Sequence, residues 1–383
     1  MKHFVYFSVL TILTGVFLSC RAKPERVAIG AALSRLNQPA AELALTEINE
    51  AGGIGGVPIE LAGADWQESR FDAAETLRWA QRFTETRDLL AVIGHEDSTT
   101  SLTAAPLYNE AGVPHILTIS THPAITGIGA WTYRLCVSDA VQARTLAEYA
   151  VRDWAKQRIS IFYVNDDYGR GLAELFESRV RKLGGEIVSS TFHRNTLKED
   201  DKEVIASTIA RLRDAGGIDL AVLFQRLEAA RWTIGAIREN GLDADILGSD
   251  NLTQPHFLQS APELLEGVRS VAFFFPEPGD ARALQFTRKF RDVTGRDANY
   301  AHAYAYDAIY LIRDAVLSGG FSREGIKTYL DGIIDDETTL DGVAGPYRIG
   351  PDRDARRALY IVESQAGEYR LVKKVAAASS AID

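Results

Sequence analysis

The sequence has few cysteines and no dense tract of basic residues. Two cysteines among 383 residues can form neither a disulfide framework nor a four-cysteine zinc site. The 52 Asp and Glu residues outnumber the 42 Lys and Arg residues, for a formal net charge of −10 at pH 7. An acidic chain of this kind is a poor candidate for binding nucleic acid or anionic lipid through its folded part. We therefore expect no nucleic-acid partner.

The sequence also has no recognisable motif for a metal ion, a nucleotide or catalysis. Its seven histidines include no pair at the spacing that metal ligands take on a helix. His95, Asp97 and Ser98 are close in sequence, but near neighbours on one turn point in different directions and cannot line up as a catalytic triad. The two glycines at 169 and 171 lack the third glycine of a dinucleotide fingerprint. We expect a protein that is not an enzyme and holds no cofactor or metal.

Long apolar runs are absent except at the N-terminus. Residues 4–18 are mostly apolar and follow a short basic start, but a membrane-spanning helix needs about 20 residues. This pattern predicts a secretory signal over residues 1–19. It resembles a bacterial lipoprotein signal because Ser19 directly precedes Cys20, which predicts a lipid on Cys20. A plain secretory signal or a single membrane anchor is the alternative. If Cys20 is lipidated, Cys136 has no disulfide partner within the mature chain.

From residue 26 onward, short apolar runs alternate with longer amphipathic stretches, and glycine follows many of the latter. The apolar runs are Val27–Leu33, Ile59–Gly63, Leu89–Gly94, His115–Ile119, Ile159–Val164, Glu186–Phe192, Leu220–Phe224 and Asp245–Gly248. Most lack clean alternation, which is typical of parallel strands buried on both faces. The pattern predicts an α/β fold with doubly wound sheets. Because it restarts near residue 158, after a predicted helix over 140–156, we infer two α/β lobes.

The last third of the chain is less regular. An apolar strand is predicted over 267–275, and helical spacing predicts helices over 282–294, 300–317 and 322–333. Residues 346–349 and 358–362 are predicted to pair as a terminal hairpin.

Six segments together resemble a known family. They read Val-Ala-Ile-Gly at 27–30, Glu-Ile-Asn-Glu-Ala-Gly-Gly-Ile-Gly-Gly at 47–56, Ala-Val-Ile-Gly-His at 91–95, Asp-Tyr-Gly-Arg-Gly at 167–171, Tyr-Ala-Tyr-Asp-Ala-Ile-Tyr-Leu at 304–311 and Gly-Val-Ala-Gly-Pro-Tyr at 342–347. In this order, over roughly residues 26–365, they resemble type I periplasmic binding proteins, in the branch of the leucine/isoleucine/valine-binding proteins of ABC importers.

The resemblance implies the type I periplasmic binding protein fold, with two lobes joined by three crossovers and a solute held in the cleft between them. The first lobe would take residues 26–136 and 277–343, and the second 137–276 and 344–375. It also implies a protein without a catalytic step, which captures a solute, closes, and delivers it to a membrane permease.

In the first lobe, candidate ligand contacts follow two predicted strands. Open α/β sheets bind ligands beyond the carboxyl ends of their strands. Ser98 or Thr99 can N-cap the helix after the strand 89–94, and the free N–H groups there favour a carboxylate. The resemblance places Ser98 at a carboxylate-binding serine and implies further contacts from Ile119 and Thr121. The alternatives are a capping serine without a ligand and an ordinary polar loop.

In the second lobe, the resemblance places Tyr168 at an aromatic residue that covers the ligand, and Asp250 at the acid that pairs with the ligand's ammonium group. A helix-start tyrosine and a solvated loop aspartate are the alternatives. Arg226 stands where close relatives carry an aromatic residue. Because arginine forms bidentate pairs with carboxylates, Arg226 leaves two alternatives: a second acidic group on the ligand, or an ion pair with Glu228 or Asp250.

Together these features predict an extracytoplasmic or periplasmic solute-binding lipoprotein of an ABC importer, anchored to a membrane through its lipid. Its ligand would be an amino acid or a related amine-bearing acid. Two alternatives use the same fold. A ligand-sensing module needs a transmembrane helix or an output domain, and no second long apolar run exists. An envelope scaffold would be favoured by a cleft that cannot hold a zwitterion.

Overall fold

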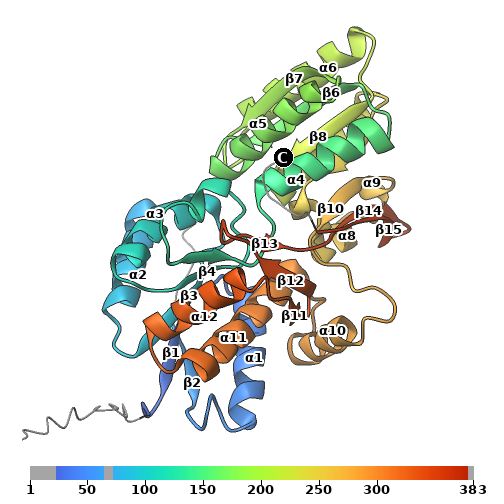
Figure 1. Ribbon diagram of the computed structural model, residues 1–383. Coiled ribbons are helices and arrows are strands. Elements are labelled where there is room, and N and C mark those ends of the chain that lie inside the picture. The colour runs from blue at the N-terminus through green and yellow to red at the C-terminus, as the bar shows by residue number, and fades with distance from the viewer. Residues whose placement is uncertain (1–22, 64–71, 378–383) are drawn as a thin grey trace, which may run out of the picture.

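The computed structural model describes residues 23–63 and 72–377, and these form two α/β lobes, each built around its own sheet (Figure 1). The predicted α/β fold with two lobes is therefore confirmed. The predicted signal over residues 1–19 and the predicted lipidation site Cys20 lie outside the described residues. Among the described residues, no helix has the length and apolar character needed to cross a membrane.

The first sheet has five parallel strands in the order β2-β1-β3-β4-β5. They are β1 (Val27–Ala32), β2 (Ile59–Ala62), β3 (Leu89–Gly94), β4 (His115–Leu117) and β5 (Thr132–Arg134). Every residue of β1 and β3 is buried, as expected for central parallel strands. The lobe's helices include α1 (Gln38–Glu50), α2 (Ala73–Glu85) and α3 (Ser98–Glu110). From much later in the chain, α11 (Tyr300–Gly319) packs on α1 and β3, and α12 (Arg323–Asp335) packs on α11 and β3.

The second sheet has seven strands in the order β15-β14-β10-β9-β8-β6-β7. Its parallel strands are β6 (Arg158–Val164), β7 (Glu186–His193), β8 (Leu220–Phe224), β9 (Asp245–Gly248) and β10 (Arg269–Ala272), and β14 (Leu359–Gln365) and β15 (Glu368–Val375) are antiparallel. Its helices are α4 (Asp139–Glu148), which continues as a π-helical turn over Tyr149–Asp153, α5 (Asp167–Lys182), α6 (Glu199–Asp214), α7 (Leu227–Glu239) and the short α8 (Pro255–Ser260) and α9 (Pro262–Leu265).

The predicted C-terminal hairpin is wrong. β12 (Gly345–Ile349) pairs with β11 (Leu340–Gly342) and β13 (Ala355–Arg356) in a small separate sheet, whereas β14 pairs with β10 and β15. The reason is burial: Leu359, Ile361 and Val362 are almost fully buried, which a two-stranded hairpin at the surface cannot provide. The three helices predicted before it are confirmed as α10 (Ala281–Thr294), α11 and α12.

The chain passes between the lobes three times within the described residues: between β5 and α4, between β10 and α10, and between β13 and β14. Each passage is a short segment rather than a long tether. The exact lobe bounds given above stay a prediction. These passages place the carboxyl ends of strands from both sheets on either side of one cleft.

Candidate functional site

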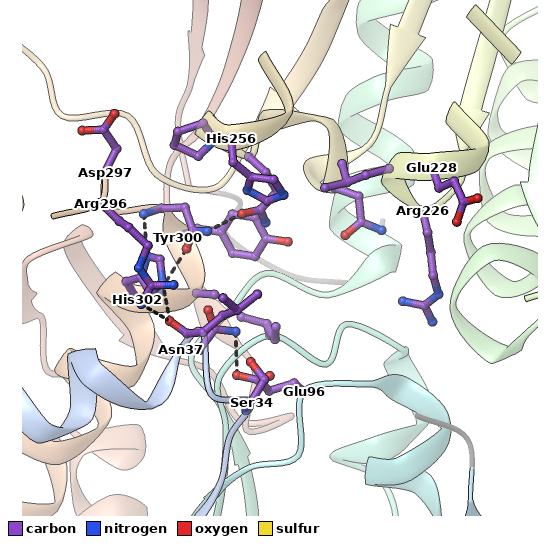
Figure 2. Close-up of a pocket in the computed structure, with 18 of the residues that line it drawn as sticks. Ser34, Asn37, Glu96, Arg226, Glu228, His256, Arg296, Asp297, Tyr300 and His302 are labelled. Carbon is purple, nitrogen blue, oxygen red and sulfur yellow. Dashed lines mark hydrogen bonds between the residues drawn. The ribbon is translucent and has the colours of Figure 1, made fainter. Parts of the chain in front are cut away.

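A cavity of about 1140 Å³ lies between the lobes and is bounded by the loops that follow strands of both sheets. Figure 2 shows Ser34, Asn37 and Glu96 entering it from the first lobe and Arg226 and Glu228 from the second. This is the position that open α/β sheets use for ligands. Of the predicted site residues, Ile119 and Arg226 line the cavity. Ser98, Thr121, Tyr168 and Asp250 are buried.

The helix α3 begins at the cleft, but its N-cap is Asp97. The Asp97 carboxylate accepts the backbone N–H of Thr99 at 3.0 Å, so the prediction that Ser98 or Thr99 caps this helix is wrong. Aspartate caps a helix at least as well as serine, and its charge also suits the helix dipole. Ser98 instead occupies the first helical position, where its Oγ accepts the backbone N–H of His122 at 3.3 Å.

Buried hydroxyl groups join the two first-lobe loops that carry the predicted residues. Ser120 Oγ lies 2.6 Å from Ser101 Oγ and donates to the His95 carbonyl oxygen at 2.8 Å. Thr121 lies between Ser120 and His122, and the backbone N–H of His122 donates to Ser98 Oγ. The structure therefore places Ser98 and Thr121 near each other. Both side chains are at most 3% exposed.

Tyr168 and Asp250 are brought together in direct contact. Asp250 begins a 3₁₀ turn, Asp250–Thr253, that follows β9, and its carboxylate accepts hydrogen bonds from Tyr168 Oη at 3.0 Å and Tyr300 Oη at 2.8 Å. Burial raises the pKa of the Asp250 carboxyl, and the two tyrosine hydroxyls act against this rise. Tyr300 also lines the cavity, so Asp250 lies directly behind the cavity wall.

Tyr300 is a site residue that sequence reasoning missed. It is the first residue of α11, a helix of the first lobe, so its bond to Asp250 crosses the cleft. The available signal was weak: Asn299 is a good N-cap before an aromatic-rich helix, but nothing in the sequence indicates that this helix starts at the cleft.

Arg226 forms an ion pair across the cleft. Its Nη2 lies 2.6 Å from Asp97 Oδ2 in the first lobe and 2.8 Å from Asp166 Oδ2 in its own lobe. The sequence suggests Glu228 or Asp250 as a partner of Arg226, but the partners are Asp97 and Asp166. Burial acts to lower the pKa of Arg226, but the two carboxylates outweigh it and hold this pKa above its usual value.

Further contacts between the lobes lie on both sides of the cavity. Thr99 Oγ1 donates to Asp167 Oδ2 at 2.8 Å, close to the Arg226 ion pair. On the other side, Gln259 Nε2 donates to Asp297 Oδ2 at 2.9 Å, and Asn299 donates to Gln254. The structure is therefore a closed arrangement in which the lobes touch directly.

Cys136 lies in the first passage between the lobes, between β5 and α4. It is buried, and its Sγ contacts the Ser120 carbonyl oxygen at 3.5 Å. In the part of the chain that the structure describes, no three His, Cys, Asp or Glu side chains are grouped so as to hold a metal ion.

Comparison with known proteins agrees with this architecture. The sequence profile of a family described as periplasmic binding protein matches residues 29–368. A curated relative, the Leu/Ile/Val-binding protein homolog 1 of Brucella abortus, is 26% identical over 285 residues, which cover 74% of this chain and 73% of the relative.

Three solved structures have the same fold. A leucine-binding protein from Thermotoga maritima has a TM-score of 0.80 at 22% identity and covers 91% of this chain and 99% of its own. An ABC transporter substrate-binding protein from Desulfitobacterium hafniense, in complex with Leu, has a TM-score of 0.75 at 26% identity and covers 90% and 99%. A solute-binding protein of an ABC transporter from Rhodopseudomonas palustris, in complex with 3,4-dihydroxybenzoic acid, has a TM-score of 0.79 at 19% identity and covers 93% and 99%.

The family profile spans far more than half of the chain, and the two lobes, the crossovers and the interlobe cavity are what that family implies. Members of this family have no catalytic step, in agreement with the expectation from the sequence. The chain thus belongs to the periplasmic binding protein family, whose members bind solutes and are not enzymes.

Proposed function

We propose that this protein is the extracytoplasmic solute-binding component of an ABC importer and that it captures an amino acid, or a related amine-bearing acid, between its lobes. The observation that carries the proposal is the buried carboxylate of Asp250 directly behind the cavity wall, across from the N-terminus of α3. Support also comes from relatives: one is named for Leu, Ile and Val, and another was solved with Leu.

The carboxylate of the ligand would bind at the first lobe. The N-terminus of α3 offers backbone N–H groups and a positive dipole end, with the Ser98 hydroxyl beside them. We assign a backbone contact to Ile119 and hydroxyl and amide contacts to Thr121. The charge of Asp97 at this helix end would oppose a second anion, but the Arg226 guanidinium 2.6 Å away offsets part of this charge.

The amine of the ligand would bind at the second lobe. A buried carboxylate is costly without a counter-charge, and the hydrogen-bond partners of Asp250 include the two neutral tyrosine hydroxyls. A ligand ammonium supplies the missing positive charge. In this proposal Tyr168 positions the Asp250 carboxylate and covers the ligand with its ring.

Arg226 would bound the ligand at the opposite wall of the cavity. Since two carboxylates already share its guanidinium, a second acidic group on the ligand would have to compete with Asp97 and Asp166. We therefore propose that Arg226 borders the ligand at this wall, and that the ligand has no second acidic group.

Native mass spectrometry of protein purified without denaturation tests the ligand class, because a co-purified solute appears as added mass. A thermal-shift screen of the twenty standard amino acids follows, and calorimetry then measures the best of them. A co-purified benzoate-type acid, or no thermal shift with any amino acid, would reject the amine-bearing ligand.

The Asp250→Asn variant tests the amine site directly. Asparagine keeps the shape and can still accept a tyrosine hydroxyl, but it removes the charge that pairs with an ammonium group. Loss of one partner of a buried charge pair costs about 2–5 kcal/mol, so amino-acid binding should weaken about 30-fold or more.

Ser98→Ala tests the carboxylate end of the ligand. It should cost less binding free energy, about 1–2 kcal/mol, because backbone N–H groups remain. Asp335→Asn, at the end of α12, is the control. Wild-type affinity in Asp250→Asn would mean that the ammonium assignment is wrong.

A further inference from the structure

A second buried acid, Asp139, lies behind the proposed amine site. Asp139 is the first residue of α4, and none of its surface is exposed. The Gln142 side chain joins it to Asp250: Nε2 donates to Asp139 Oδ1 at 3.1 Å, and Oε1 accepts the Asp250 backbone N–H at 3.1 Å. The backbone N–H of Asp139 also donates to the Thr121 carbonyl oxygen at 2.8 Å. Asp139 therefore contacts both halves of the proposed ligand site.

The charges around these two acids do not balance. Neither Asp139 nor Asp250 forms an ion pair within residues 23–63 and 72–377. Arg134 is a cation that acts on Asp139, and it is itself fully buried. Arg134 already pairs with Asp354 at 3.5 Å and donates to the carbonyl oxygens of Thr121 and His122.

The other titratable groups that face the two acids are neutral or are already paired. They are Cys136 on the same passage, Tyr168 on α5, Tyr300 on α11 and Asp354 before β13. Burial raises the pKa of the Cys136 thiol and of both tyrosine hydroxyls, so none of these groups carries a charge near pH 7. Two neighbouring buried carboxyl groups without a cation of their own cannot both ionise at low cost.

We propose that Asp139 and Asp250 hold a single proton between them in the ligand-free protein, and that a ligand ammonium bound at Asp250 displaces this proton to solvent. Asp139 is then a positioning residue that couples amine binding to proton release. The inference rests on the proposed function, because it takes an amine as the displacing group. The inference adds proton release on ligand binding, which a site with a single acid would lack.

The electrostatics of Asp139 agree with this role. Burial, and then the charge of Asp250, raises the pKa of Asp139 to about 8. One pH unit below that value, about nine tenths of the free protein carries the proton. The positive charge of a bound ammonium favours the ionised form, so close to one proton leaves for each ligand bound at pH 7. By linkage, affinity for an amine rises with pH between about 6 and 8, by up to tenfold per unit.

Nuclear magnetic resonance tests the shared proton without any ligand. Protein with carbon-13 in its aspartate carboxyl groups is dialysed free of small molecules and titrated from pH 5 to pH 9. We expect one carboxyl resonance to titrate near pH 8 in wild type and to disappear in Asp139→Asn. Asp307→Asn removes another buried aspartate, paired with Arg357, and should leave that resonance in place. Absence of any aspartate that titrates above pH 6 in wild type would overturn the proposal.

Calorimetry tests the displacement. L-Leucine, or the standard amino acid with the largest thermal shift, is titrated at pH 7 in phosphate and in Tris, whose ionisation heats differ. Wild type should release between about 0.5 and 1 proton per ligand, and Asp139→Asn should bind with almost no release. Equal release by the two proteins, or none by wild type, would overturn the coupling while leaving an amino-acid ligand intact. If no amino acid binds, the proposed function and the coupling both fail, and the carboxyl titration alone decides whether the proton is shared.

Discussion

Individual buried side chains behind the cleft determine how this protein responds to acid. His95 Nε2 contacts the Tyr108 hydroxyl at 3.0 Å, and His115 Nε2 contacts the Gly94 carbonyl oxygen at 2.5 Å. Burial lowers the pKa of His95 to about 3 and that of His115 to about 4. Both rings are therefore neutral in the folded protein at pH values where the unfolded chain binds protons.

The free energy of unfolding should fall as the pH drops below 6.5, because His95 and His115 bind protons in the unfolded chain but stay neutral in the folded protein. Each such group contributes up to about 1.4 kcal/mol per pH unit to the free energy of unfolding, down to its folded pKa. Urea unfolding of wild type and His115→Gln between pH 4.5 and 6.5 should show a slope smaller by about this amount in the variant. His256→Gln, at an exposed position, serves as the control. Parallel slopes for all three proteins would contradict the assignment.

At the scale of elements, the start of α7 ties the second lobe to the start of α3. Arg226 is the N-cap residue of α7, and its guanidinium lies between Asp97 of the first lobe and Asp166 of the second. Without Arg226 these two carboxylates would face each other across the cleft with no cation between them, and like charges repel.

Arg226→Gln should therefore shift the ligand-free protein towards an open arrangement. Small-angle scattering should report a larger radius of gyration for the variant than for wild type. Arg231→Gln, on the exposed face of the same helix, should keep the wild-type profile. If Arg226→Gln scatters like wild type, the ion pair does not hold the lobes together.

The elements themselves could be predicted because their signals are local. Buried parallel strands such as β1 and β3 appear as continuous apolar runs, and glycine follows helices such as α5. The pairing of strands near the C-terminus and the contacts across the cleft could not be predicted, because both join residues far apart in the chain. The hydrogen bond from Tyr300 to Asp250 and the ion pair from Arg226 to Asp97 are such contacts. Family resemblance supplied Ser98, Tyr168 and Asp250, but it gave no indication of the buried acid Asp139.

At the scale of the whole molecule, the predicted lipid on Cys20 would hold an acidic protein at a membrane. Cys20→Ser should move the protein from the membrane fraction to the soluble fraction, because one lipidated residue would account for its attachment. Cys136→Ser is the matched control, since that thiol is buried in the fold. Membrane retention of Cys20→Ser, with no acyl mass on the mature N-terminus, would argue against a lipoprotein.

The three passages between the lobes also govern when the fold can be completed. The first lobe needs α11 and α12, which end at residue 335, and the second needs β14 and β15, which end at residue 375. A chain that emerges from the ribosome N-terminus first therefore holds at least 335 residues before either lobe has all its elements. Domains generally fold as units once their segments are present. Neither lobe can reach its complete fold before residue 335 has been synthesised, so until then the growing chain stays incompletely folded.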